Sequence, residues 1–520
     1  MVTAVSLSFV EALDDACRRY PKRIAVESCG GVASEQSLTY EALDNGSRIL
    51  ASELLRVGVR EDEPVIVFVS NLSGDLRSLL GVWRAGAAAV LVHRDCVAGT
   101  LRSILQRTGA RVLVWGEVTP TVPLPDGTKT GTGPAQILVL DREAPSLRDT
   151  LRDAAVVVFT SGSTGEPKGV VLSRDAFIRK LAAINEVLRM PQGVRTLLVL
   201  QLGFTFGQWV SLLTLLQGGT LLVAPKFVAS ECLEILADKR IDHVALVPTM
   251  MRAMLSELRS DRGRDHLARL RAAGYPRLIC AGGEPLAPAL GKQFRELLPH
   301  TGIADVYGLT ETCTSDFILR PDLFDRYSGS IGFPSPGVEF RITDPAHGDP
   351  VALGQTGELE IKTDFIMNGY LDAPELTRSA FRDGYFRTGD LARQSSDGAV
   401  YLAGRAKDLI LRGGNKVSPI EVDATLIQHP EVEASLTAGV PDPLMGERIH
   451  TLVVLNSKSN LDTDTLRSWA FTRLDKFKVP DRIHIGSRIP QGRTGKDDRR
   501  ALVQWLGDQG LLEPQASEEA

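Results

Sequence analysis

Two spacings of apolar residues alternate through the first 330 positions of the chain. In residues 9–16 and 40–55, apolar side chains recur about every 3.6 positions, which predicts amphipathic helices. Residues 63–69, 87–92 and 111–115 are short runs of small or β-branched apolar side chains, which are typical of buried strands. Because the two patterns follow one another, we expect an α/β fold with parallel sheets covered by helices on both faces.

The alternation continues beyond residue 150 and predicts further strands at 154–159, 196–200, 220–223, 243–247, 278–280 and 303–306. Ser173 is suited to cap the helix expected after it. Residues 119–136 are rich in Pro, Gly and Thr, which predicts an exposed loop before a strand at 137–140.

The pattern of predicted helices and strands changes twice after residue 330. Short strands with Gly and Pro turns first indicate a β-rich module, and beyond residue 402 the pattern returns to mixed α/β with a helix at 419–426. We therefore expect a large N-terminal domain, residues 1–404, built of β-α-β subdomains plus the β-rich module. A small α+β C-terminal domain would comprise residues 405–520.

Composition narrows the class of function. The net charge is -5, with 59 basic and 64 acidic residues, so the composition indicates neither a basic surface for nucleic acid nor a polybasic surface for membranes. Six cysteines lie scattered without a CxxC pair, which argues against a zinc ribbon or a disulfide framework. The apolar stretch 79–92 is too short to span a membrane and is broken by Arg84. We expect a cytoplasmic protein that acts on small molecules, with no nucleic-acid partner and no membrane span.

The stretch 160–169, TSGSTGEPKG, follows the predicted strand 154–159. Its glycines let backbone N–H groups turn inward, its hydroxyls can donate to phosphate oxygens, and Lys168 adds a positive charge. It is not a Walker A loop, because Pro167 and Gly169 flank the lysine where that motif has a glycine and a hydroxyl. The stretch predicts an anion-binding loop that stays mobile over its ligand; by itself it is also compatible with a surface turn.

Four further motifs follow in order. Residues 307–311 read YGLTE, 385–390 read YFRTGD, 404–408 read GRAKD and 492–496 read GRTGK. Alone, Asp390 would be read as a turn-capping residue and Lys496 as a solvated charge. Together with the 160–169 loop, the series resembles the adenylate-forming superfamily over nearly the whole chain. That superfamily contains acyl- and aryl-CoA synthetases, luciferases and the adenylation domains of nonribosomal peptide synthetases.

The resemblance implies a small, mobile C-terminal domain and two half-reactions. A carboxylate and ATP give acyl-adenylate and pyrophosphate, and a thiol then displaces AMP. The implied cofactors are ATP and Mg²⁺, with CoA or the phosphopantetheine of a carrier protein as co-substrate. Nucleotide-binding roles are implied for Thr160, Ser161, Gly162, Ser163, Thr164, Gly165, Lys168, Gly283, Tyr307, Asp390 and Arg405.

Catalytic roles are implied for three residues. Thr310 matches the donor to the α-phosphate, Glu311 the Mg²⁺ ligand, and Lys496 the lysine that bridges the substrate carboxylate and the α-phosphate. In the same way Lys407 matches the hinge of the C-terminal domain, while Gly413 and Gly414 match the thiol path. Since the adenylate is already activated, no protein nucleophile is needed, and we expect Cys280 and Cys313 to be core residues.

Gly207 narrows the class of carboxylic acid that the enzyme could activate. Amino-acid-activating members carry an aspartate at the matching position, and an ammonium buried without such a partner is costly. The candidate acyl pocket is mainly apolar, although core packing would explain its members equally well: Phe204, Phe206, Gly207, Met250, Ala281, Gly282 and Cys313.

The sequence therefore predicts an ATP-dependent, AMP-forming acid–thiol ligase for a fatty or aromatic carboxylic acid, with CoA as the acceptor. Two alternatives stay open. One is a stand-alone adenylation enzyme that loads an acyl carrier protein, and the other is a non-catalytic nucleotide-binding protein.

Overall fold

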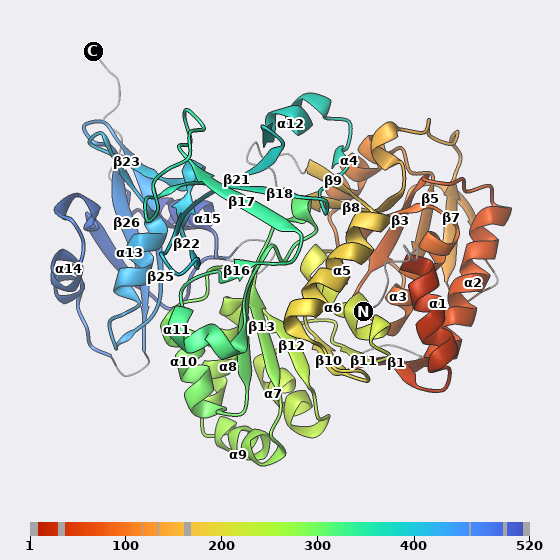
Figure 1. Cartoon of the computed structure of the whole chain (residues 1–520), viewed down its shortest axis with the longest axis horizontal. Coiled ribbons are helices and arrows are strands. Elements are labelled where there is room, and N and C mark those ends of the chain that lie inside the picture. Colours follow the sequence, from red (N-terminus) through yellow and green to blue (C-terminus); the bar gives the residue numbers. More distant parts are fainter. Residues whose placement is uncertain are drawn as a thin grey trace.

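The computed structural model describes residues 9–29, 37–116, 118–131, 133, 135–160, 168–456, 459–491 and 497–512. Figure 1 shows two large sheets with their helices, a β-rich module beside them, and a separate blue unit formed by the C-terminal residues. The predicted mixed α/β class is confirmed. Among the described residues, no helix is both long and apolar enough to cross a membrane.

The first large sheet contains eight strands, and its centre is built from the predicted apolar runs. β3 has the sequence PVIVFV and every residue of it is buried, as expected of a strand covered on both faces. The strand order is β19 (Gly369–Tyr370), β9 (Lys168–Ser173), β8 (Ala154–Thr160), β4 (Ala88–His93), β3 (Pro64–Val69), β5 (Val112–Trp115), β7 (Gln136–Leu140) and β6 (Gly127–Thr130).

The edges of this sheet depart from the prediction of parallel strands. β8, β4, β3 and β5 are parallel, whereas β9, β19, β7 and β6 pair antiparallel. The prediction of a continuous loop over 119–136 is wrong, because it contains β6. That strand reads GTKT and is mostly exposed, so it carries none of the apolar signal by which a strand is recognised.

The second large sheet contains nine strands. The order is β16 (Phe333–Pro334), β15 (Phe317–Leu319), β14 (Gly302–Tyr307), β13 (Leu278–Gly282), β12 (His243–Leu246), β10 (Arg195–Leu198), β11 (Thr220–Val223), β1 (Ile24–Ser28) and β2 (Ser37–Thr39). The strands from β14 to β1 run parallel, and only the outer pairs are antiparallel. The carboxyl ends of β13 and β14 therefore meet at one edge of the sheet.

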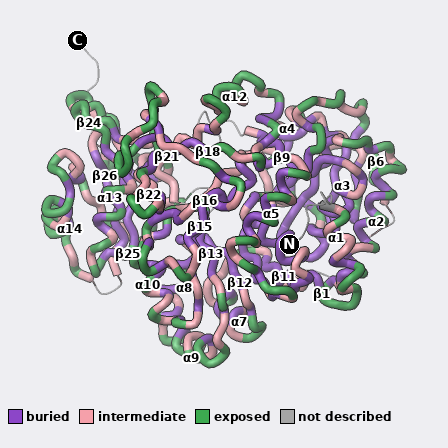
Figure 2. The backbone as a smooth tube through the Cα atoms, viewed as in Figure 1, coloured by how far each residue is buried: buried purple, intermediate pink, exposed green. Residues whose placement is uncertain are grey.

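Helices separate and cover these sheets. They are α1 (Phe9–Arg19), α2 (Tyr40–Arg56), α3 (Ser73–Arg84), α4 (Ala98–Thr108), α5 (Arg174–Leu188), α6 (Thr205–Leu216), α7 (Ala229–Asp238), α8 (Pro248–Leu258), α9 (Gly263–Ala273), α10 (Pro288–Leu297), α11 (Phe324–Tyr327) and α12 (Pro374–Ser379). Ser173 caps α5 as predicted, since its side chain accepts a hydrogen bond from the Ala176 N–H. Figure 2 shows buried residues along the central strands, with exposed residues gathered on outer helices such as α9.

The β-rich module comprises β17 (Val338–Thr343), β18 (Gly357–Thr363), β20 (Phe381–Arg382), β21 (Tyr385–Gln394) and β22 (Val400–Arg405). A 3₁₀ turn, Ala406–Asp408, then leads to the C-terminal sheet of β23 (Ile410–Arg412), β24 (Asn415–Val417), β25 (Val432–Asp442), β26 (Gly446–Leu455) and β27 (Arg482–Gly486). The helices α13 (Pro419–Leu426), α14 (Thr463–Phe471) and α15 (Arg499–Asp508) complete this unit. Its two apolar clusters contain only residues from Ile410 onward.

One buried histidine makes the stability of the N-terminal core depend on pH. His243 opens β12, is 1% exposed, and neither of its ring nitrogens has a hydrogen-bond partner. Burial disfavours the imidazolium ion and lowers the pKa of His243 to about 3. The unfolded chain takes up a proton near the ordinary histidine pKa of about 6.5, but the folded chain does so only near the lowered value. Stability is therefore lost as the pH falls from about 6.5 toward 3.

We expect His243→Leu to reduce this acid sensitivity. Between pH 7 and pH 4.5, the free energy of unfolding of the wild type should fall by about 2–3 kcal/mol more than that of the variant. Urea denaturation at the two pH values measures the difference. His347, whose side chain is 78% exposed and lies 3.1 Å from Asp344, provides the comparison, because His347→Leu removes a histidine that is not buried and should leave most of the acid sensitivity in place. Equal slopes for the wild type and His243→Leu would contradict the account.

Candidate active site

The predicted motif residues Tyr307 and Glu311 lie on the segment that leaves β14 at the shared edge of β13 and β14. Gly282 pairs with Val306 in the sheet, so both strands end at the same level. Gly308 cannot carry a side chain here, because a Cβ atom would lie 2.1 Å from the Ser315 backbone nitrogen. Gly283 adopts φ +82, a left-handed conformation that suits glycine. The sheet edge is thus shaped by two tightly turned segments.

A carboxylate from the β-rich module reaches this edge. Asp390 on β21 is 4% exposed and accepts hydrogen bonds from two groups: the Tyr307 hydroxyl at 2.6 Å and the Arg405 Nε at 2.6 Å. Burial and the neighbouring Asp390 charge raise the pKa of Tyr307 well above its usual value, so its hydroxyl stays protonated as a donor. Each carboxylate oxygen has lone-pair capacity for a further hydrogen bond. Asp390 can therefore bind hydroxyl groups of a ligand.

A second carboxylate, Glu311, lies on the same segment. The Tyr370 hydroxyl donates to its Oε1 at 2.8 Å, and burial together with this carboxylate raises the pKa of Tyr370. Lys168 also lies beside Tyr370, with its Nζ 5.3 Å from the ring centroid. Tyr370 thus connects the lysine of the 160–169 stretch with the carboxylate of the YGLTE motif. Sequence reasoning missed Tyr370, which belongs to no recognised motif.

Glu311 fits the role of a magnesium ligand. It forms no ion pair within the part of the chain that the structure describes, and Tyr370 engages only one of its oxygens. The described residues contain no group of three or more His, Cys, Asp or Glu side chains suited to hold a metal ion. A hard cation at Glu311 would therefore take most of its oxygen ligands from bound phosphates and water, which is the usual coordination of Mg²⁺.

The segment after Glu311 is strained and anchored by a buried ion pair. Cys313, Thr314 and Ser315 have φ values of 57, 68 and 54, three consecutive left-handed residues without a glycine. Next to them, the Lys180 Nζ lies 2.8 Å from the Asp316 Oδ1, and both side chains are 0% exposed. The Thr312 hydroxyl also donates to Asp316. This ion pair fixes the turn that carries Thr310 and Glu311.

The two ends of the predicted anion-binding loop pair with each other. Thr160 ends β8 and Lys168 begins β9, and the two residues face each other in an antiparallel pair. Sequence reasoning placed both in a loop and missed β9. Five predicted phosphate-binding residues, Ser161, Gly162, Ser163, Thr164 and Gly165, lie outside the described residues, as does Lys496.

The candidate acyl-pocket residues are only partly brought together. Phe206 stacks on Trp209 with centroids 5.7 Å apart, and a Cβ atom on Gly282 would lie 3.0 Å from the Phe206 ring. Phe204 is 40% exposed and precedes α6, and Met250 on α8 is partly buried. A Cβ atom on Gly207 would lie 2.4 Å from the Gln201 carbonyl oxygen. A side chain at this position would meet backbone.

Cys280 and Cys313 lie in the core, as predicted. Ala281, Cys280 and Cys313 are each 0% exposed, and burial raises the pKa of the Cys313 thiol to about 12 and that of Cys280 further. The six cysteines form no disulfide. The hinge candidate Lys407 lies in the turn Ala406–Asp408, and Gly413 and Gly414 form the left-handed turn between β23 and β24.

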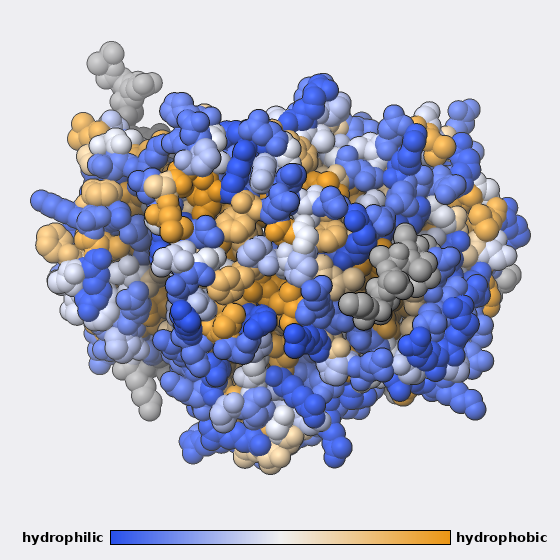
Figure 3. Space-filling view, in the orientation of Figure 1, coloured by the Kyte–Doolittle hydropathy of each residue, from blue (hydrophilic) through white to orange (hydrophobic). Residues whose placement is uncertain are grey.

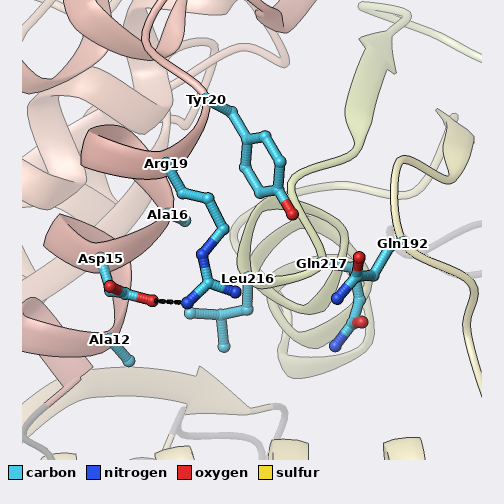
Figure 4. Close-up of a pocket in the computed structure, with 8 residues that line it drawn as sticks. All are labelled: Ala12, Asp15, Ala16, Arg19, Tyr20, Gln192, Leu216 and Gln217. Atoms are coloured by element: carbon cyan, nitrogen blue, oxygen red, sulfur yellow. Dashed lines mark hydrogen bonds and ion pairs between the residues drawn. The ribbon is translucent and has the colours of Figure 1, made fainter.

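A small pocket elsewhere takes no part in this constellation. It lies between α1 and the end of α6 and is lined by none of the predicted site residues (Figure 4). Two of its lining residues, Arg19 and Asp15, pair with each other at 2.7 Å. The surface view of Figure 3 shows a mostly hydrophilic face with apolar side chains gathered near its centre.

Comparison with protein families gives matches over most of the chain. Residues 13–371 match the model of the AMP-binding enzyme family, and residues 421–496 match the AMP-binding enzyme C-terminal domain. The chain is 33% identical over 485 residues to a feruloyl-CoA synthase from an Amycolatopsis species, covering 92% of this chain and 95% of that protein. It is 30% identical over 488 residues to sulfoacetate–CoA ligase from Cupriavidus necator, covering 90% and 93%.

Solved structures agree with these matches. ATP-bound MatB from Rhodopseudomonas palustris aligns with a TM-score of 0.80 at 25% identity, covering 97% of this chain and 100% of that one. The amide bond synthetase McbA from Marinactinospora thermotolerans aligns with a TM-score of 0.79 at 26% identity, covering 96% and 100%.

The buried ion pair below the site yields a prediction. Lys180→Met leaves the Asp316 carboxylate buried without its cation, which should lower the free energy of unfolding by about 3–5 kcal/mol. Urea denaturation followed by tryptophan fluorescence measures this. The exposed Lys22 supplies the matched control, because Lys22→Met should change the value by less than about 0.5 kcal/mol. If Lys180→Met changed stability as little as the control, the ion pair would not anchor the turn.

Proposed function

This chain belongs to the AMP-binding enzyme family, and we propose that it activates a fatty or aromatic carboxylic acid as acyl-AMP and transfers the acyl group to CoA. The family match and the CoA ligases among the relatives support an AMP-forming acid–thiol ligase that uses ATP.

One observation carries the proposal: a single segment after β14 collects the groups that a nucleotide requires. The Tyr307 hydroxyl donates a hydrogen bond to Asp390 of the β-rich module. Four residues later, Glu311 accepts a hydrogen bond from Tyr370, whose ring contacts Lys168. These contacts support Asp390 as a hydroxyl acceptor, Glu311 as a magnesium ligand and Lys168 as a phosphate-binding cation, contributed by separate parts of the chain.

We assign the roles by the charges that the reaction develops. Attack of the acid on the α-phosphate builds negative charge on phosphate oxygens, and donors and cations that are already in place stabilise it. Asp390, oriented by Tyr307 and Arg405, would accept the ribose hydroxyls. Glu311 would hold Mg²⁺, which neutralises phosphate charge when bound. Lys168 would neutralise the departing pyrophosphate and Thr310 would donate to the α-phosphate.

Adenylation needs Lys496 at the reacting centre, whereas thioester formation needs space for the thiol in the same place. We propose that the chain divides into residues 1–404 and 405–520, and that the smaller part rotates about Lys407 between the two steps. The supporting feature is that β22 ends at Arg405 and the next sheet begins at Ile410. A Cβ atom on Gly414 would meet nothing within 4 Å, so this turn has room beside it for a pantetheine chain.

The proposed acid class rests on Gly207 and its surroundings. An aspartate side chain at this position would start from a Cβ only 2.4 Å from the Gln201 carbonyl oxygen, so the backbone would have to shift to accept it. The position therefore offers no carboxylate to an α-ammonium group. The nearby Phe206 ring, which stacks on the fully buried Trp209, suits an apolar or aromatic acyl group instead.

ATP–pyrophosphate exchange over a panel of acids tests the proposal. The panel is octanoate, palmitate, benzoate, cinnamate, phenylalanine, leucine and glycine. We expect exchange with fatty or aromatic acids, and acyl-CoA detectable by mass spectrometry once CoA is added. Exchange with the amino acids alone would contradict the acid class, and a strict requirement for a holo carrier protein would contradict CoA as the acceptor.

A further inference from the structure

A polar contact joins the C-terminal unit to the N-terminal domain beside the site. Asp497, which follows Lys496 in the sequence, accepts a hydrogen bond from the Arg252 Nη2 at 2.8 Å. The Thr249 hydroxyl lies 3.4 Å from the other carboxylate oxygen. Arg252 and Thr249 are both on α8, in the N-terminal domain. The side chains of Arg252 and Asp497 are 19% and 21% exposed, so the pair is mostly shielded from water.

Glu284 brings this contact to the edge of the sheet. The Asp497 backbone N–H donates to the Glu284 Oε1 at 3.3 Å, and the Thr249 hydroxyl lies 3.0 Å from the Glu284 Oε2. Glu284 follows Gly283 directly after β13, and β13 pairs with β14, which ends at Tyr307. The contact therefore lies beside the segment that carries the nucleotide-binding candidates.

The C-terminal unit holds Asp497 from its other side. Gln491 and Asp497 form an antiparallel bridge, and the Asp498 N–H donates to the Pro490 carbonyl at 3.0 Å. The Asp498 side chain then caps α15 by accepting from the Arg500 and Ala501 backbone N–H groups. Asp497 is thus held by Gln491 and by the start of α15, while its carboxylate accepts from Arg252 on α8.

We propose that Asp497 and Arg252 form a latch that positions the Lys496 segment for adenylation and opens before the thiol step. The latch, made of Thr249, Arg252, Glu284 and Asp497, rests on the proposed two-step function. Asp497 and Arg252 are positioning residues, since they act through Lys496.

The composition of the latch suits a contact that has to open. Arg252 also lies 3.9 Å from Glu284 and donates to the Thr249 hydroxyl at 2.8 Å. When Asp497 leaves, the guanidinium keeps these two partners, and the released carboxylate is solvated by water. Neither state buries an unpaired charge, so the two conformations can be close in free energy. An apolar contact of the same extent would expose hydrophobic surface on opening.

The two half-reactions separate a positioning role from a general structural one. Arg252→Gln and Asp497→Asn should each slow ATP–pyrophosphate exchange roughly 10- to 100-fold, because a charge-assisted hydrogen bond is lost. Neither should slow thioester formation from CoA and the synthetic adenylate of the panel acid with the fastest exchange. The charge swap Arg252→Asp with Asp497→Arg should recover part of the exchange rate. The matched controls are Arg259→Gln at the exposed C-cap of α8 and Asp508→Asn at the end of α15.

Hydrogen exchange of the free protein gives a readout that needs no substrate. The peptide that contains the Asp497 amide should exchange faster in Arg252→Gln than in the wild type and in Arg259→Gln. Unchanged exchange there, or equal slowing of both half-reactions, would overturn the latch. A wild type inactive with every acid would instead refute the proposed function, and hydrogen exchange would still decide whether the latch exists.

Discussion

The buried ion pair of Lys180 and Asp316 is the contact on which the geometry of the site depends. Lys180 belongs to α5, which follows β9 of the eight-stranded sheet, and Asp316 lies between β14 and β15 of the nine-stranded sheet. One ion pair thus links elements of both sheets. It also lies next to three left-handed residues, Cys313, Thr314 and Ser315, whose backbone persists only where the surroundings determine it. The segment with Thr310 and Glu311 is therefore held in place before any ligand binds.

Holding the segment rigid has a chemical purpose. Groups that face developing phosphate charge act best when they need no rearrangement during the reaction. Tyr307, Asp390 and Arg405 form one hydrogen-bonded set, while Glu311, Tyr370 and Lys168 form another along the same segment. The moving parts of the proposed mechanism lie beyond the hinge candidate Lys407, in the rest of the C-terminal unit and its polar contact at Asp497.

Features encoded by neighbouring residues in the sequence were predicted correctly. Apolar runs such as 63–69 and 87–92 are strands, Ser173 caps its helix, and the ordered motifs pointed to the family to which the chain belongs. Features that depend on distant partners were missed. β6, at the sheet edge, and β9, between β8 and β19, are strands through their antiparallel partners, and Tyr370 matters only because it meets Glu311, 59 positions away. Arg252 and Asp497, 245 positions apart, carry no motif at all. The roles of the motif residues, including Lys496, stay predictions.

The central claim is that the nucleotide binds at the end of β14, where Asp390 of β21 meets Tyr307. Isothermal titration calorimetry with AMP tests this most directly, using Asp390→Asn and the matched exposed variant Asp397→Asn. The amide of Asp390→Asn replaces an acceptor oxygen by a donor beside Tyr307 and Arg405, so AMP affinity should fall about tenfold or more. Asp397→Asn should bind AMP like the wild type. Equal affinity in all three proteins would contradict the account.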